Sequence, residues 1–127
     1  MLCQFTVKNF RCIKDELTLD MQAADINEHP KSIIIDADGE SFLPLAALYG
    51  PNGTGKSTVI EALSVLVEKI IIPIFITEGK KDNTLILNEE NTIQPFMFSE
   101  DTINLPTEFE IFFRTKNYEY QCESSPD

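Results

Sequence analysis

The sequence predicts an α/β lobe in which a β-rich sheet of parallel and antiparallel strands surrounds one long helix. Three observations carry this prediction. Apolar and polar residues alternate near both ends of the chain, which is the period of half-buried strands. A glycine-rich stretch, residues 50–58, stands between a short apolar run and a helical pattern. The 127 residues, of which 43% are hydrophobic, suffice for one core, so residues 1–127 are expected to form a single lobe.

Residues 1–49 are expected to supply antiparallel strands. Apolar residues alternate with polar ones over residues 3–7 and again over residues 17–21. A polar stretch follows, and then Asp38-Gly39 stands between two short apolar runs, which is typical of a hairpin turn. Residues 45–49 are short and apolar, as expected of a buried strand that leads into the glycine-rich stretch.

The glycine-rich stretch and its helix are expected over residues 50–72. The helix is apolar nearly all round, so we expect it to be covered on most sides. Residues 73–127 are expected to form a variable region and a closing β-hairpin. Short strands are predicted at residues 84–87 and 96–98, and the hairpin strands at residues 107–114 and 118–122.

The glycine-rich stretch is a complete phosphate-binding P-loop of the pattern G-x-x-x-x-G-K-[ST]. Its residues are Gly50, Pro51, Asn52, Gly53, Thr54, Gly55, Lys56 and Ser57, with Thr58 next. Glycines lack a Cβ, so the backbone N–H groups can approach a phosphate chain, and the positive end of the following helix adds to this anion site. The lysine would place its charge against the β- and γ-phosphates, and the Ser57 hydroxyl would bind Mg²⁺. The sequence therefore predicts Mg-ATP as the ligand of residues 50–58.

Charge and composition argue against two other kinds of partner. The 21 acidic residues outnumber the 10 basic ones and give a net charge of −11, which repels phosphate backbones. We therefore expect this chain alone to bind no nucleic acid. The start lacks a signal segment, and the apolar run at residues 70–76 is too short to span a bilayer and is broken by proline. We expect a cytoplasmic protein with no membrane partner.

Other kinds of site find little support. Three cysteines without C-x-x-C spacing argue against a metal cluster or a disulfide framework. His29 is the only histidine, which excludes a multi-histidine metal site and a histidine-based triad and favours a solvated loop residue. Residues 36–39 begin like a calcium loop but lack its spacing to glycine, so a hairpin turn is favoured.

The chain resembles one known group, the ABC-type ATPases of the SMC, RecF and OLD-like kind, especially the AAA ATPases of bacterial abortive-infection and phage-defence systems. The matching stretches are residues 5–15, which contain Asn9-Phe10-Arg11, and residues 49–58, with further agreement at residues 61–63 and 105–111. The resemblance implies the N-terminal lobe of an ABC-ATPase-like P-loop NTPase. In its full-length context such a protein would hydrolyse ATP to drive a conformational switch in a DNA-repair or phage-defence assembly.

The resemblance also implies roles for single residues. Asn52 would reach toward the γ-phosphate, Thr58 toward the α-phosphate, and Arg11 would lie over the nucleotide. Gln94 stands in a region where such ATPases carry a glutamine that contacts metal and water. Plainer interpretations stay open: Arg11 as a solvated charge in a turn, Gln94 as an ordinary loop residue, and Phe10 as a core residue rather than a base-stacking platform.

Two departures from this group bear on catalysis. The chain lacks the apolar strand that ends in Asp-Glu (Walker B), and residues 85–90 imitate it without the aspartate. It also lacks a Leu-Ser-Gly-Gly-type signature. We therefore expect a lobe that is truncated relative to a full ATPase domain, that has no assigned catalytic residue, and that needs the remainder of the domain or a head-to-tail homodimer partner. The alternatives are a non-catalytic interaction module that retains the P-loop fold and, with less support, a nucleotide kinase.

Overall fold

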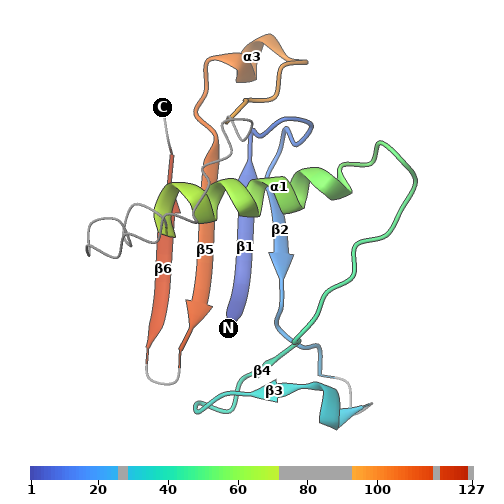
Figure 1. The fold of residues 1–127 in the computed structure, drawn as a ribbon, viewed down its shortest axis with the longest axis vertical. Coiled ribbons are helices and arrows are strands. Elements are labelled where there is room, and N and C mark those ends of the chain that lie inside the picture. The colour runs from blue at the N-terminus through green and yellow to red at the C-terminus, as the bar shows by residue number, and fades with distance from the viewer. Residues whose placement is uncertain (26–28, 72–92, 116–117, 126–127) are drawn as a thin grey trace, which may run out of the picture.

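The computed structural model describes residues 1–25, 29–71, 93–115 and 118–125. A four-stranded antiparallel sheet forms its centre, in the order β2-β1-β5-β6 (Figure 1). The strands are β1 (Leu2–Lys8), β2 (Leu17–Asp20), β5 (Glu108–Arg114) and β6 (Glu119–Ser124). Both antiparallel pairs that the alternating patterns predict, one at each end of the chain, are therefore confirmed.

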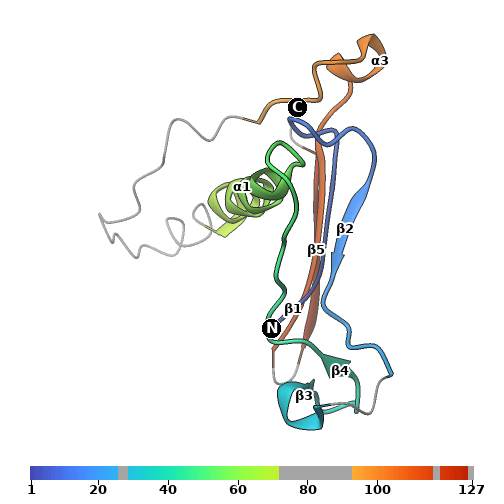
Figure 2. The same cartoon turned by 90° about the vertical axis from the view of Figure 1, so that its right-hand side faces the viewer.

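The hydrophobic core lies between this sheet and the helix α1 (Lys56–Leu66), which crosses one face of the sheet (Figures 1 and 2). In the sheet, Phe5 stands opposite Leu19 on one side and Ile111 on the other, so apolar residues of three strands share that face. The helix contributes buried apolar residues to the same cluster, namely Val59, Ala62, Val65 and Leu66. The apolar face that results from alternation in the strands thus packs against the apolar face that results from helical spacing in α1.

The P-loop helix is less covered than its sequence predicts. The α-helix α1 has 11 residues and is followed by a π-helical turn, η2 (Val67–Ile71), so the predicted single long helix to residue 72 is not confirmed. In addition, Ile60 is 57% exposed, because α1 packs against the sheet with one side only. The opposite face of the sheet is polar, with the Thr6 and Thr18 hydroxyls 3.0 Å apart and Lys8 paired with Glu108. This face therefore does not require a second apolar layer.

A small second hairpin lies beyond one end of the sheet. It consists of β3 (Ile34–Ile35) and β4 (Ser41–Phe42), which pair antiparallel, and is preceded by the short 3-10 helix η1 (Pro30–Ser32). Gly39 adopts a left-handed φ of 85° in the turn, and the Gly39 N–H donates to the Asp36 carbonyl at 3.2 Å. The predicted hairpin turn is confirmed, and His29 is exposed in the loop before it, as expected.

The predicted strand at residues 45–49 does not form. This segment runs from β4 to the start of α1 outside the sheet (Figure 2), and Leu45 and Tyr49 are 78% and 94% exposed. A strand needs a neighbour for its backbone groups, and here the segment pairs with no described strand. All described strand pairs are antiparallel, so a mixed sheet is not seen in the described part of the chain.

Two further strand predictions have different outcomes. Residues 96–98 are not a strand but form the approach to the short helix α3 (Glu100–Ile103). The strand predicted at residues 84–87 lies outside the described residues, as does the acidic pair at residues 89 and 90. No helix in the described part of the chain is long and apolar enough to cross a membrane.

Candidate functional site

The P-loop turns through left-handed backbone conformations directly into α1. Gly53 and Gly55 have φ angles of 82° and 87°, a region that residues with a Cβ rarely adopt. Gly55 is also the residue that caps the N-terminus of α1. The two glycines therefore allow the loop to meet the helix at its positive end, where an anion is favoured.

Lys56 lies within the curve of its own loop. Its ammonium group donates to the carbonyl oxygens of Gly50 at 2.7 Å and Pro51 at 2.6 Å. The Thr54 hydroxyl closes the same turn by donating to the Pro51 carbonyl at 2.8 Å. Carbonyl oxygens are neutral, so they position the ammonium group without cancelling its charge. Ser57, the next residue, is exposed at the first turn of the helix.

A hollow of about 920 Å³ opens beside this loop. The P-loop and the end of the segment before it form one side, and the connection from β1 to β2 forms the other. Its volume falls in the range of small-molecule sites, which is about 300–1,000 Å³. The residues that line it include Cys12, Asp15, Glu16, Leu17, Phe96 and the loop residues Gly50, Pro51, Thr54, Gly55 and Lys56. The hollow is therefore large enough for a ligand that has other groups besides phosphates.

The turn after β1 rests against the start of α1. Phe10 and Ile13 close this turn through two backbone hydrogen bonds of 2.9 and 2.8 Å. Cys12 then reaches α1, where its thiol donates to the Thr58 hydroxyl at 3.1 Å. A Cβ on Gly55 would lie 3.2 Å from the Cys12 sulfur, so the glycine also permits this close approach.

Arg11 contacts the P-loop helix rather than lying free in solution. Its guanidinium forms an ion pair with Glu61 of α1 and lies 5.4 Å from the centre of the Phe10 ring. It does not line the hollow, and its buried Nε has no hydrogen-bond partner among the described residues. The nucleotide contact of Arg11 thus stays a prediction. Phe10 is fully buried and packs edge-on against Phe109, which confirms its interpretation as a core residue.

The Gln94 side chain is exposed and does not line the hollow. Its backbone carbonyl, however, accepts a hydrogen bond of 2.8 Å from the Arg11 N–H. Two residues further on, Phe96 does line the hollow. Sequence reasoning missed Phe96, because it assigned residues 96–98 to a strand. It also missed the role of Cys12, whose one available signal was its place directly after Asn9-Phe10-Arg11 in the matching stretch of residues 5–15.

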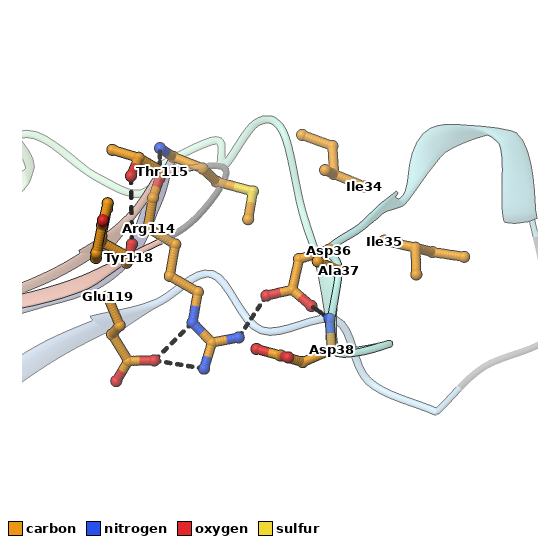
Figure 3. A pocket seen from close by; sticks show the side chains of 10 residues that line it. Ile34, Ile35, Asp36, Ala37, Asp38, Arg114, Thr115, Tyr118 and Glu119 are labelled. Carbon is orange, nitrogen blue, oxygen red and sulfur yellow. Dashed lines mark hydrogen bonds and ion pairs between the residues drawn. The ribbon is translucent and has the colours of Figure 1, made fainter.

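A second hollow, of about 830 Å³, lies at the far end of the sheet beside the β3–β4 hairpin (Figure 3). Its centre is Arg114, which forms ion pairs with Asp36, Glu40 and Glu119. Hydrogen bonds to Asp36 and Glu119 raise the pKa of Arg114 above its ordinary value. Partial burial alone would raise the pKa of Asp36, but hydrogen bonds from Arg114 and from the Asp38 and Glu40 N–H groups outweigh it and lower that pKa. Three carboxylates thus neutralise this arginine, which makes the hollow a poor phosphate site.

The described residues contain no group of three histidine, cysteine or acidic side chains arranged to hold a metal ion. The Ser57 hydroxyl remains the predicted Mg²⁺ ligand, and its exposed place beside Lys56 fits a metal ion that is carried by bound phosphates.

Comparison with known proteins identifies the family. The family described as "AAA ATPase domain" matches residues 1–126, which is nearly the whole chain and includes the P-loop, the turn after β1 and the closing hairpin. No curated protein and no solved structure matches the chain. The P-loop geometry and the family match agree, and this chain belongs to the AAA ATPase domain family.

Proposed function

We propose that this chain binds Mg-ATP with its phosphates in the loop formed by residues 50–58. The observation that carries the proposal is the placement of the Lys56 ammonium at the positive end of α1. Among the residues that the structure describes, its partners are neutral groups of its own loop. Family membership supports nucleotide binding in general. In this arrangement Lys56 and the loop N–H groups bind the phosphates, and Ser57 binds the Mg²⁺ that the phosphates carry.

In its full-length context, the protein hydrolyses ATP to drive a conformational switch in a DNA-repair or phage-defence assembly. The support for this is the resemblance to SMC, RecF and OLD-like ATPases, together with an exposed apolar patch on the surface. Leu45, Leu48 and Tyr49 are apolar, exposed and directly ahead of the P-loop. Such a patch fits an interaction site, here with the remainder of the ATPase domain or with a second copy of the chain.

The non-catalytic alternative is favoured by the composition of the P-loop side of the hollow. That side supplies a cation, a hydroxyl and backbone N–H groups, whereas phosphoryl transfer also requires a positioned water. The carboxylates that line the hollow, Asp15 and Glu16, are exposed on the opposite side. We therefore expect this chain alone to turn over ATP well below about 1 s⁻¹, the lower end of typical enzymes. Phosphate release near that rate would exclude the non-catalytic alternative.

Calorimetric titration tests the binding proposal. The chain should bind Mg-ATP and bind adenosine far more weakly, because adenosine lacks the phosphates. Ser57→Ala should remove most of the difference between titrations with Mg²⁺ and with EDTA. Ser64→Ala is the matched control, since it makes the same chemical change on the same helix two turns away. Absence of Mg-ATP binding by the folded wild-type chain, or equal Mg²⁺ dependence in Ser57→Ala and wild type, would contradict the proposal.

A further inference from the structure

Asn9 is a deeply buried polar residue at the end of β1. It is 2% exposed, and its φ of 53° is a left-handed conformation that asparagine adopts more readily than most residues. Its side-chain oxygen accepts a hydrogen bond of 2.9 Å from the Phe96 N–H. Its side-chain nitrogen donates to the carbonyls of Thr102 at 3.0 Å, Leu105 at 2.8 Å and Pro106 at 3.2 Å. The carboxamide therefore joins β1 to a segment that lies about 90 residues later in the chain.

Further bonds hold the same segment, residues 94–107, against the turn after β1. The Thr107 hydroxyl donates to the Asn9 carbonyl at 2.7 Å, and the Arg11 N–H donates to the Gln94 carbonyl at 2.8 Å. Phe96 is held on both sides, because the Thr102 hydroxyl donates to its carbonyl at 2.8 Å while its N–H is bonded to Asn9. The backbone of Phe96 is thus fixed by two side chains.

The far side of the same turn touches the nucleotide site. Cys12 is bonded to Thr58 and Arg11 to Glu61, both on the P-loop helix. Cys12 and Phe96 both line the 920 Å³ hollow that the P-loop borders. Asn9 itself does not line the hollow, but it fixes the position of Phe96 there.

We propose that Asn9 is a positioning residue of the nucleotide site: its carboxamide holds the half-buried Phe96 as the wall against which the nucleoside part of the ligand packs. This inference rests on the proposed Mg-ATP binding. The P-loop, which would bind the phosphates, is held by its own bonds around Lys56, and none of these involves Asn9. Binding energy therefore divides into a phosphate part that depends on Lys56 and a nucleoside part that depends on Phe96 and Asn9.

The test compares two ligands, Mg-ATP and Mg-tripolyphosphate, by calorimetric titration. Asn9→Gly removes the carboxamide while permitting the left-handed φ, and Phe96→Ala removes the wall itself. Each should weaken Mg-ATP about fivefold to tenfold, the effect of losing an interaction of about 1 kcal/mol, and should change tripolyphosphate affinity by less than about twofold. Lys56→Ala should weaken both ligands. Thr6→Val, which removes the hydroxyl pair on the polar sheet face, is a stability control that should affect neither.

A single-tryptophan reporter separates positioning from general stability. The chain contains no tryptophan, so Phe96→Trp provides one fluorophore at the wall. Mg-ATP should change its emission, and this change should disappear when Asn9→Gly is added. A merely structural role of Asn9 would lower the melting temperature of the double variant but leave the ATP-dependent change in place.

The outcomes distinguish this inference from the proposed function. If Lys56→Ala loses Mg-ATP affinity while Asn9→Gly and Phe96→Ala keep it, the positioning role is wrong and the binding site stands. If the wild-type chain binds neither ligand, the proposed function fails and the inference fails with it. If Asn9→Gly does not fold, the result for Phe96→Ala decides whether the proposal holds, because this variant leaves the four bonds of the Asn9 carboxamide to backbone groups in place. Wild-type Mg-ATP affinity in Phe96→Ala would overturn the proposal.

Discussion

The two hollows of this molecule each contain a prominent cation, and the partners of that cation differ. At the P-loop end, the Lys56 ammonium is bonded to two carbonyl oxygens of its own loop. At the hairpin end, the Arg114 guanidinium is bonded to the carboxylates of Asp36 and Glu119 (Figure 3) and to that of Glu40. Neutral partners leave the charge of a cation available to an anionic ligand, whereas carboxylates cancel it. The acidic partners of Arg114 thus indicate a structural role, whereas the neutral partners of Lys56 support its proposed role in binding phosphates, although the hollows are similar in size.

The strongest test of this comparison exchanges each cation for a neutral side chain. Lys56→Ala should lower Mg-ATP affinity roughly ten- to a hundredfold, since a charge-assisted contact contributes about 1.5–3 kcal/mol, and should leave the melting temperature nearly unchanged. Arg114→Met should do the opposite: it leaves Asp36, Glu40 and Glu119 facing one another, so the melting temperature should fall by a few degrees while ATP affinity stays. Calorimetric titration and thermal unfolding of both variants check this. Loss of ATP affinity in Arg114→Met would mean that the two ends are coupled.

A smaller effect, on the free energy of unfolding, is expected when alanine replaces either of two glycines that have nearly the same backbone conformation. Gly39, in the hairpin, has φ 85°, and Gly55, at the P-loop, has φ 87°. Alanine in this conformation costs roughly 1–2 kcal/mol at either position. A Cβ added at Gly39 would meet nothing within 4 Å. A Cβ added at Gly55 would lie 3.2 Å from the sulfur of Cys12, and this exposed side chain can move aside. Chemical denaturation should therefore give similar losses of unfolding free energy.

ATP binding should separate the two glycine variants. Gly55→Ala changes the loop that would hold the phosphates and should weaken Mg-ATP, whereas Gly39→Ala should bind it like wild type. If both variants bind ATP equally well, the left-handed conformation at the start of α1 is not needed for the ligand.

The smallest expected effect is a pH dependence at the hairpin end. The pKa of Asp36 in the folded protein lies below its ordinary value of 3.8. Its ionised form is therefore favoured by folding, and the stability that it contributes is complete above about pH 3.8 and is lost as the pH falls from there through the lower folded value. Thermal unfolding between pH 5 and pH 2.5 should show a steeper decline in wild type than in Asp36→Asn. Parallel curves for the two proteins would show that Asp36 does not contribute.

Local signals in the sequence were sufficient for the elements that depend on neighbouring residues. Asp38-Gly39 predicted its hairpin, because the turn needs a residue that accepts positive φ. The P-loop pattern predicted the start of α1 for the same kind of reason, since Gly55 both caps the helix and makes room for Cys12. The alternating strands predicted the sheet, because their apolar faces require a common core.

The errors concern features that depend on distant residues. Residues 45–49 have the composition of a buried strand, yet composition does not say which strand lies beside them, and here no described strand pairs with them. The partners of Asn9 lie about 90 residues away, so no local pattern indicates that its carboxamide fixes Phe96. The ion pair between Arg11 and Glu61 likewise depends on packing that the turn itself does not reveal.

The pairing of β1 has a consequence for how the protein emerges during synthesis. β1 pairs with β2 within about a dozen residues, but on its other side Val7 pairs with Phe109, which the ribosome adds about a hundred residues later. Contacts of such long sequence separation form slowly and leave apolar surface uncovered until both parts are present. The P-loop is therefore synthesised well before the sheet that supports α1 can be completed, and the proposed nucleotide binding should begin only once β5 has been inserted beside β1.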